Sequence, residues 1–223
     1  MFKKWLQILK KDTLMDHAYQ RSFEMLDITL SMFREARESL RNRQDSEINL
    51  RIKETDKKVN SYEREVRRMI FNHLLLRGAP DLASGLALVS IIIDMERIGD
   101  YTKNMVELAL DHPGKLHGGQ LEEVLLRMEQ AVEDNFIQTK KCFVEGDGEL
   151  ALKLLEKYAW VADACDDGVR QIVQEKDASV QPGDAAALAL YVRFLKRVNS
   201  HLRNITTSVS NPFDRIGFVP KKK

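Results

Sequence analysis

Apolar residues recur along this chain at steps of three and four, the spacing that places them on one face of an α-helix. Six segments show this pattern: residues 14–43, 47–77, 80–110, 120–145, 149–177 and 182–210. Only five prolines and eleven glycines occur in 223 residues, which favours long helices over turn-rich β structure. The pattern therefore predicts an all-α fold with six long helices.

The third predicted helix is far more apolar than the two before it. Between Leu82 and Ile93, apolar side chains cover most of its circumference. A helix that is apolar nearly all round belongs in the middle of a bundle. The sixth helix opens at Pro182 and is again apolar at its start.

A break at residues 112–114 (His-Pro-Gly) divides the six helices into two sets of three. Short connections make neighbouring helices antiparallel. We therefore expect two tandem antiparallel three-helix bundles, one in residues 1–113 and the other in residues 114–223.

The two halves repeat one another in sequence. Residues 95–105 read MERIGDYTKNM and residues 195–205 read LKRVNSHLRNI, with Arg, then Ile or Val, then Asn at the same places. Residues 65–70 (EVRRMI) are echoed by residues 168–173 (GVRQIV). Recurrence at a fixed period indicates a duplicated structural unit.

Composition narrows the classes of function. Lys and Arg total 35 and Asp and Glu total 34, a formal net charge of +1, so no general attraction to nucleic acid is expected. Cys142 and Cys165 lie far apart and outside any CxxC pair, which is typical of reduced cysteines in a cytosolic protein. No apolar run approaches the roughly 18 residues of a membrane span. We expect a cytoplasmic protein.

The first twelve residues form a separate amphipathic segment. Phe2, Trp5, Leu6 and Leu9 share one helical face, and lysines surround it. Two interpretations remain open: the segment packs on the bundle as an apolar clasp, or it rests on an anionic membrane surface as a cationic amphipathic helix. The second would give the protein a peripheral membrane contact.

Two polar stripes are candidates for a metal site. Glu96 and Asp100 are four residues apart and share one helical face, and Asp56, Asn60 and Glu63 form a second stripe on the preceding helix. Stripes of this kind across a helix–helix groove build carboxylate metal sites in helical bundles. Their oxygen ligands suit Mg, Mn, Ca or iron.

The plainer interpretation is a solvated helix face, on which Arg97 pairs with Asp100. In the second half, Lys196 and Ser200 stand where the first half has its acidic pair. We expect Lys196 to form an ion pair with nearby aspartates there. The weaker candidates for metal ligands in this half are Asp163, Asp166 and Asp167.

Residues 94–100 (DMERIGD), followed by Asn104, resemble the signature of the PhoU family. Residues 212–218 (PFDRIGF) resemble a tail seen in some members, and the family's two three-helix repeats would cover essentially the whole chain. By this resemblance, Glu96 and Asp100 fill the E/D-x-x-x-D motif of the first repeat. Asp56 and Asn60 match the companion motif, with Asn60 replacing the usual acid.

The resemblance implies a non-enzymatic regulator of phosphate homeostasis. PhoU proteins are cytosolic and mostly dimeric, and they act beside phosphate transporters and often a membrane sensor kinase. The implied partners are thus a phosphate transporter, a sensor kinase or both, together with a second copy of the chain. Some members carry metal clusters, which implies a divalent or ferric ion here: iron, Mn, Mg or Zn.

Two other functions are weighed against this one. A metal-dependent phosphohydrolase would use Glu96 and Asp100, whereas a helical adaptor would hold no metal. The sequence contains no P-loop, no Gly-rich phosphate cradle and no defensible catalytic triad. The histidines are scattered and are expected at the surface or at its boundary: His17, His73, His112, His117 and His201.

Overall fold

A computed structural model describes residues 13–42 and 51–218 of the chain. The expectations for residues 1–12, and the predicted start of the second helix near residue 47, lie outside these ranges. The α-helices are α2 (Leu14–Arg41), α3 (Arg51–Arg77), α4 (Leu82–Asp111), α5 (Glu122–Glu145), α6 (Gly148–Lys157), α7 (Trp160–Val173) and α8 (Pro182–Ser210).

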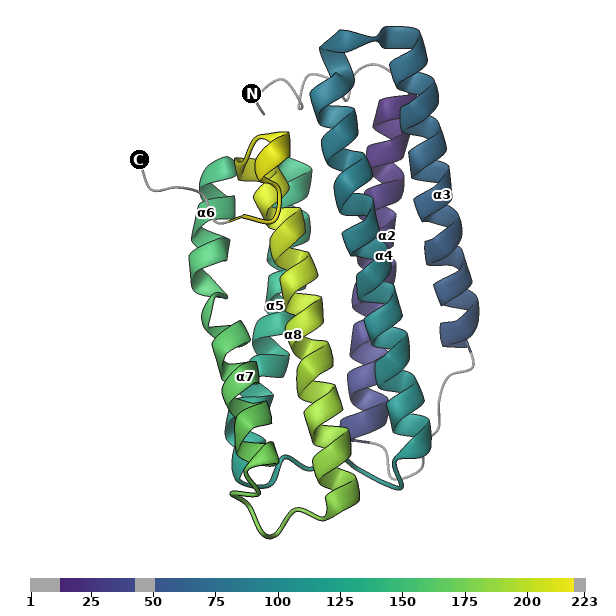
Figure 1. Cartoon of the computed structure of the whole chain (residues 1–223). Helices are drawn as coiled ribbons and strands as arrows, with labels where there is room; N and C mark the ends of the chain where they lie inside the picture. Colours follow the sequence, from purple (N-terminus) through teal and green to yellow (C-terminus); the bar gives the residue numbers. More distant parts are fainter. Residues whose placement is uncertain (1–12, 43–50, 219–223) are drawn as a thin grey trace.

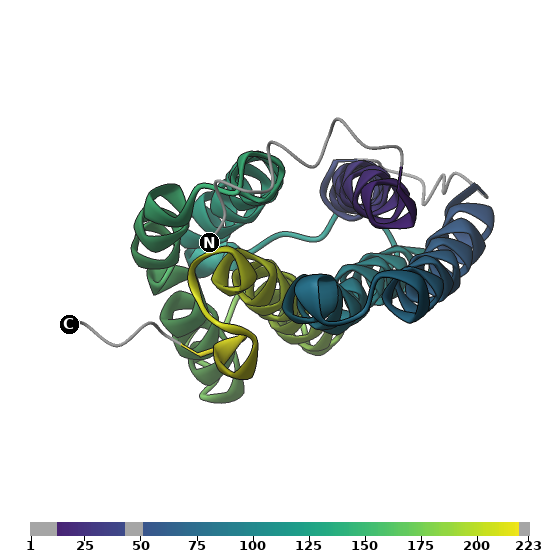
Figure 2. The same cartoon turned by 90° about the horizontal axis from the view of Figure 1, so that it is seen from above.

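The helices form two antiparallel bundles, as the sequence predicts. Helices α2, α3 and α4 pack together in one, and α5, α6, α7 and α8 pack together in the other. Figure 1 shows α4 and α8 running in opposite directions side by side, and Figure 2 places this pair at the centre of an elongated cross-section. The all-α prediction is confirmed, while the boundary at residue 113 stays a prediction.

One predicted helix is interrupted. The helix expected over residues 149–177 is two helices, α6 and α7, separated by a turn at Tyr158 and Ala159. The turn lets two consecutive side chains reach one carboxylate on α5: the Tyr158 hydroxyl donates to Asp134 at 2.5 Å and Lys157 Nζ lies 2.6 Å from it. Periodicity alone did not reveal this break, because both pieces keep the helical spacing.

The central helices bury the same positions of the repeat. Of the eleven buried positions of α4, ten have a buried counterpart in α8, 100 residues later. In α4 they are Leu88, Ile91, Ile92, Met95, Ile98, Gly99, Thr102, Met105, Val106 and Ala109. This match extends the sequence duplication to the packing, since these ten positions are buried in both repeats.

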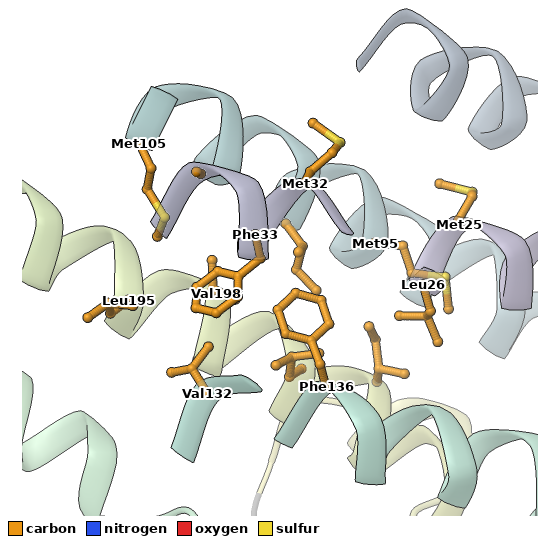
Figure 3. Packing of buried hydrophobic residues seen from close by; sticks show 14 of the residues in the cluster. Met25, Leu26, Met32, Phe33, Met95, Met105, Val132, Phe136, Leu195 and Val198 are labelled. Atoms are coloured by element: carbon orange, nitrogen blue, oxygen red, sulfur yellow. The ribbon is translucent and has the colours of Figure 1, made fainter. Parts of the chain in front are cut away.

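A continuous apolar core joins the two bundles. Phe33 of α2 and Phe136 of α5 meet with ring centroids 5.5 Å apart, and Figure 3 shows Met95 and Val198 beside them. Both cysteines are buried and free, as expected of a reduced protein. Within the described ranges, none of the helices combines the length and the apolar character that crossing a membrane requires.

One ion pair is buried between the bundles. Arg41 at the end of α2 lies with its Nε 2.9 Å from the Glu129 carboxylate of α5, and their side chains are only 6% and 4% exposed. The Tyr191 hydroxyl of α8 donates to the same carboxylate at 2.8 Å. Burial raises the pKa of Glu129, against the opposing effect of Arg41. These three groups link helices α2, α5 and α8.

We expect Arg41→Met to lower the free energy of unfolding by about 3–5 kcal/mol, because Glu129 would remain buried without its counter-charge. Arg34→Met is the matched control, since Arg34 pairs with Glu133 but is 49% exposed. Such exposed pairs contribute about 0–1 kcal/mol. Urea unfolding followed by circular dichroism measures both, and equal effects would show that burial of the Arg41 pair is unimportant.

Candidate functional site

The two predicted carboxylate stripes face one another across α3 and α4. The Lys103 ammonium of α4 lies between them, with Nζ 3.4 Å from Asp56 Oδ2 and 3.4 Å from Asp100 Oδ1. Asp56 is buried on α3, and Asn60, one turn later, is half-buried. The geometry therefore brings together carboxylates that lie more than forty positions apart in the sequence.

Two arginines pair with the remaining carboxylates of the groove. Arg97 lies with its Nη1 3.0 Å from Asp100 and its Nε 3.7 Å from Glu96. On α3, Arg67 pairs with Glu63 at 2.7 Å, one helical turn away. The Arg97–Asp100 pair is the one that the plainer sequence interpretation expects.

The groove is an acidic environment for Glu96. Its pKa is raised, first by burial and then by the negative charge of Asp100, while Arg97 opposes the shift. The charges of Glu63 and Asp56 on α3 contribute to the same increase. The carboxylates on α3 and α4 are therefore close enough for their charges to affect one another.

The donor set as arranged does not fit a metal ion. In the part of the chain that the structure describes, no three His, Cys, Asp or Glu side chains are placed to hold one. The cation between Asp56 and Asp100 is the Lys103 ammonium. Sequence reasoning missed Lys103, although it follows Asp100 by three residues and therefore lies on the same helical face.

The second repeat holds its aspartates in ion pairs. Lys196 Nζ lies 2.5 Å from Asp166, as the sequence analysis expects, and Arg193 lies 3.3 Å from the same carboxylate. Asp167 pairs with Arg170 at 2.6 Å, and Asp163 is exposed. These aspartates, the weaker metal candidates, do not converge on one point.

A polar cluster that the sequence did not reveal joins the two motif helices. Asp94 Oδ1 on α4 accepts hydrogen bonds from His201 Nδ1 at 2.7 Å and from Asn204 Nδ2 at 2.8 Å, both on α8. Tyr101 stacks on the His201 ring, with centroids 5.7 Å apart, and also meets Phe194. Asp94 and Phe194 occupy the same repeat position, so the two contacts are related by the internal symmetry.

The prediction that the histidines lie at the surface or its boundary is wrong for two of them. His73 is buried with Nε2 2.8 Å from Asp81, and His112 is buried with Nε2 2.8 Å from Asp184. Each carboxylate lies on another element or past a turn, so single-helix periodicity gave no sign of it. A buried imidazole needs a hydrogen-bond partner, and these carboxylates provide it.

We expect Asp100→Asn to lower the pKa of Glu96 toward its ordinary value, because one repelling charge is removed. A raised carboxyl pKa means that protonation of Glu96 favours the fold; this contribution is present at low pH and is lost as the pH rises through the raised pKa. Carboxyl NMR titration measures the pKa. Asp111→Asn, on an exposed position of the same helix, is the control and should leave Glu96 unchanged.

Comparison with known proteins agrees with the fold and the motif. The PhoU domain model matches residues 23–109, which contain both carboxylate stripes. The chain is similar to two proteins described as phosphate-specific transport system accessory protein PhoU homologs. It is 27% identical over 166 residues to the one from Synechocystis sp., with 72% of each chain covered. It is 26% identical over 220 residues to homolog 1 from Thermotoga maritima, covering 93% of this chain and 87% of the relative.

Two crystal structures share the fold. PhoU from Pseudomonas aeruginosa superposes with a TM-score of 0.78 at 20% identity, covering 88% of this chain and 95% of that one. The phosphate transport system regulatory protein PhoU from Streptococcus pneumoniae gives a TM-score of 0.74 at 15% identity, covering 87% and 92%. The domain match on the motif-bearing repeat, the relative that aligns along almost the full length and the shared fold together identify a PhoU domain in residues 23–109 and a PhoU-like fold for the chain.

Proposed function

We propose that this protein regulates phosphate transport through contacts with a phosphate transporter, a phosphate-sensing kinase or both. The observation that carries the proposal is the alignment with a PhoU accessory-protein homolog over 93% of this chain and 87% of the relative. Such coverage leaves little of either chain outside the alignment. We propose that the protein works as a homodimer at the cytoplasmic face of the membrane, where both partners are reached.

Exposed apolar side chains at the tip of the α3–α4 hairpin support a role in protein contacts. Phe71, Leu75 and Leu76 are 63%, 70% and 80% exposed, and Leu82 at the start of α4 is 46% exposed. Figure 1 shows this tip extending beyond the start of α2. Contiguous exposed apolar groups are typical of interaction sites, and we propose that this tip contacts the membrane partner.

Deletion of the gene should leave phosphate uptake active under phosphate excess, because the repressing contact is lost. Complementation should fail with Leu75→Glu/Leu76→Glu if the tip makes that contact. The matched control is Val173→Glu, a substitution of an equally exposed apolar residue on α7 (74% exposed). Uptake of labelled phosphate measures both effects. Unchanged uptake in the deletion strain would overturn the regulatory role, and normal complementation by the tip variant would overturn only the contact.

A metal-loaded form is a separate proposal. The carboxylates of Glu96, Asp100, Asp56 and Glu63 share one groove, which supports it, but Lys103 would have to leave before an ion could enter. We expect Lys103→Met to bind Mn²⁺ more tightly than the wild type, because a competing cation is removed. Calorimetry measures the affinity. Equal affinity in both proteins would show that Lys103 does not compete for the site.

The phosphohydrolase alternative is tested with the wild-type protein and a Glu96 variant. An enzyme of this kind would hydrolyse phosphoesters or polyphosphate with Mg, Mn or iron supplied, and Glu96→Gln would abolish the activity. The ion pairs that engage Asp100 and Asp56 in the groove favour the regulator. Turnover that depends on Glu96 would instead favour the hydrolase.

A further inference from the structure

A small pocket opens in the second bundle where the helix is interrupted between α6 and α7. Its volume is about 30 Å³, which is room for about two ordered waters or one compact ion. The described residues that line it include the turn residues Tyr158 and Ala159 and, from α8, Asn199, Ser200 and Arg203. Among the described lining residues, Arg203 is the only one with a charged side chain.

Arg203 brings an unmatched charge to this pocket. Its Nε is buried and has no hydrogen-bond partner among the described residues. A buried donor without a partner is costly and calls for an explanation. No carboxylate lines the pocket; Asp134, which accepts a hydrogen bond from the Tyr158 hydroxyl, is already paired with Lys157. An external anion would satisfy the guanidinium.

The internal duplication explains why the charge is unmatched. Arg203 occupies the repeat position of Lys103, which pairs with Asp100 and Asp56 in the first bundle. The position of Asp100 is Ser200 in the second repeat, and the echo of residues 65–70 at 168–173 places Ala159 at the position of Asp56. The cation is kept, but neither of its carboxylates is.

Polar donors accompany the guanidinium. Asn199 uses its Oδ1 to accept from Asn135 Nδ2 at 2.9 Å, which leaves its own amide N–H groups as donors. Ala159 and Ala162 place the pocket at the start of α7, where Ala159 provides no side-chain cap. The Ala159 and Val161 N–H groups there already donate to the Glu156 and Tyr158 carbonyls at 3.3 Å, so the side-chain amide of Asn199 is the donor that accompanies Arg203.

We propose that this pocket binds a free tetrahedral oxyanion, and that inorganic phosphate is its ligand. Arg203 supplies the charge, and the Asn199 amide supplies hydrogen-bond donors. The small, partly enclosed volume favours the free ion over a phosphoryl group carried by a larger molecule. The site does not depend on the regulatory role proposed above, because binding is a property of the isolated protein.

Calorimetric titration of the full-length protein with inorganic phosphate, in a buffer without other oxyanions, tests the proposal. We expect Ser200→Asp to weaken binding by about tenfold or more, because it restores an internal partner for Arg203. Arg203→Met should weaken it similarly. Arg193→Met is the matched control, since Arg193 is exposed on the same helix and pairs with Asp166; its affinity should stay near that of the wild type.

Absence of phosphate binding in the wild type, or equal affinity in all four proteins, would overturn the site. Ser200→Asp keeps Arg203 in place, so the test survives if Arg203→Met fails to fold, and thermal melting identifies that failure. A sugar phosphate is titrated in parallel. Tighter binding of this monoester than of inorganic phosphate would overturn the assignment to the free ion.

Discussion

The architecture depends on packing one face of α4 against one face of α8. Ile91, Ile92 and Met95 of α4 are fully buried, whereas Leu86 and Ile93 are 37% and 40% exposed, so the helix that the sequence predicts to be buried nearly all round keeps part of its apolar surface in water. The packing of α4 against α8 covers the buried face of each and joins the two repeats into one core. The antiparallel arrangement makes the contacts between the repeats equivalent in pairs: Asp94 meets His201, and Phe194 meets Tyr101, at the same two repeat positions.

Polar groups then fix how the bundles meet. Apolar packing alone tolerates sliding, because one aliphatic contact resembles the next. The Arg41–Glu129–Tyr191 contacts tie α2, α5 and α8 together at one point, and Asp94 with His201 and Asn204 ties α4 to α8 at another. Each group would be costly to bury in a different register, where its partner is missing.

The same position of the duplicated scaffold carries opposite electrostatics in the two repeats. In the first, carboxylates surround Lys103; in the second, Arg203 lines a pocket of neutral side chains. The same fold accommodates both arrangements, since Lys103 and Arg203 lie at the edge of the core. A scaffold that both repeats share therefore carries different chemistry at the same position.

The sequence by itself determined the helices, their pairing into repeats and the two carboxylate stripes, because helical periodicity is a local property written along each segment. It also predicted the ion pair of Lys196, since replacement of Glu96 by a cation in the repeat left nearby aspartates to match. Only the tertiary structure decided which groups face one another across helices: Lys103 between Asp56 and Asp100, Glu129 opposite Arg41, and the break beside Arg203. Helical periodicity predicts which face of a helix is buried but not which side chain contacts that face. The contacting side chain is set by packing between segments far apart in the chain.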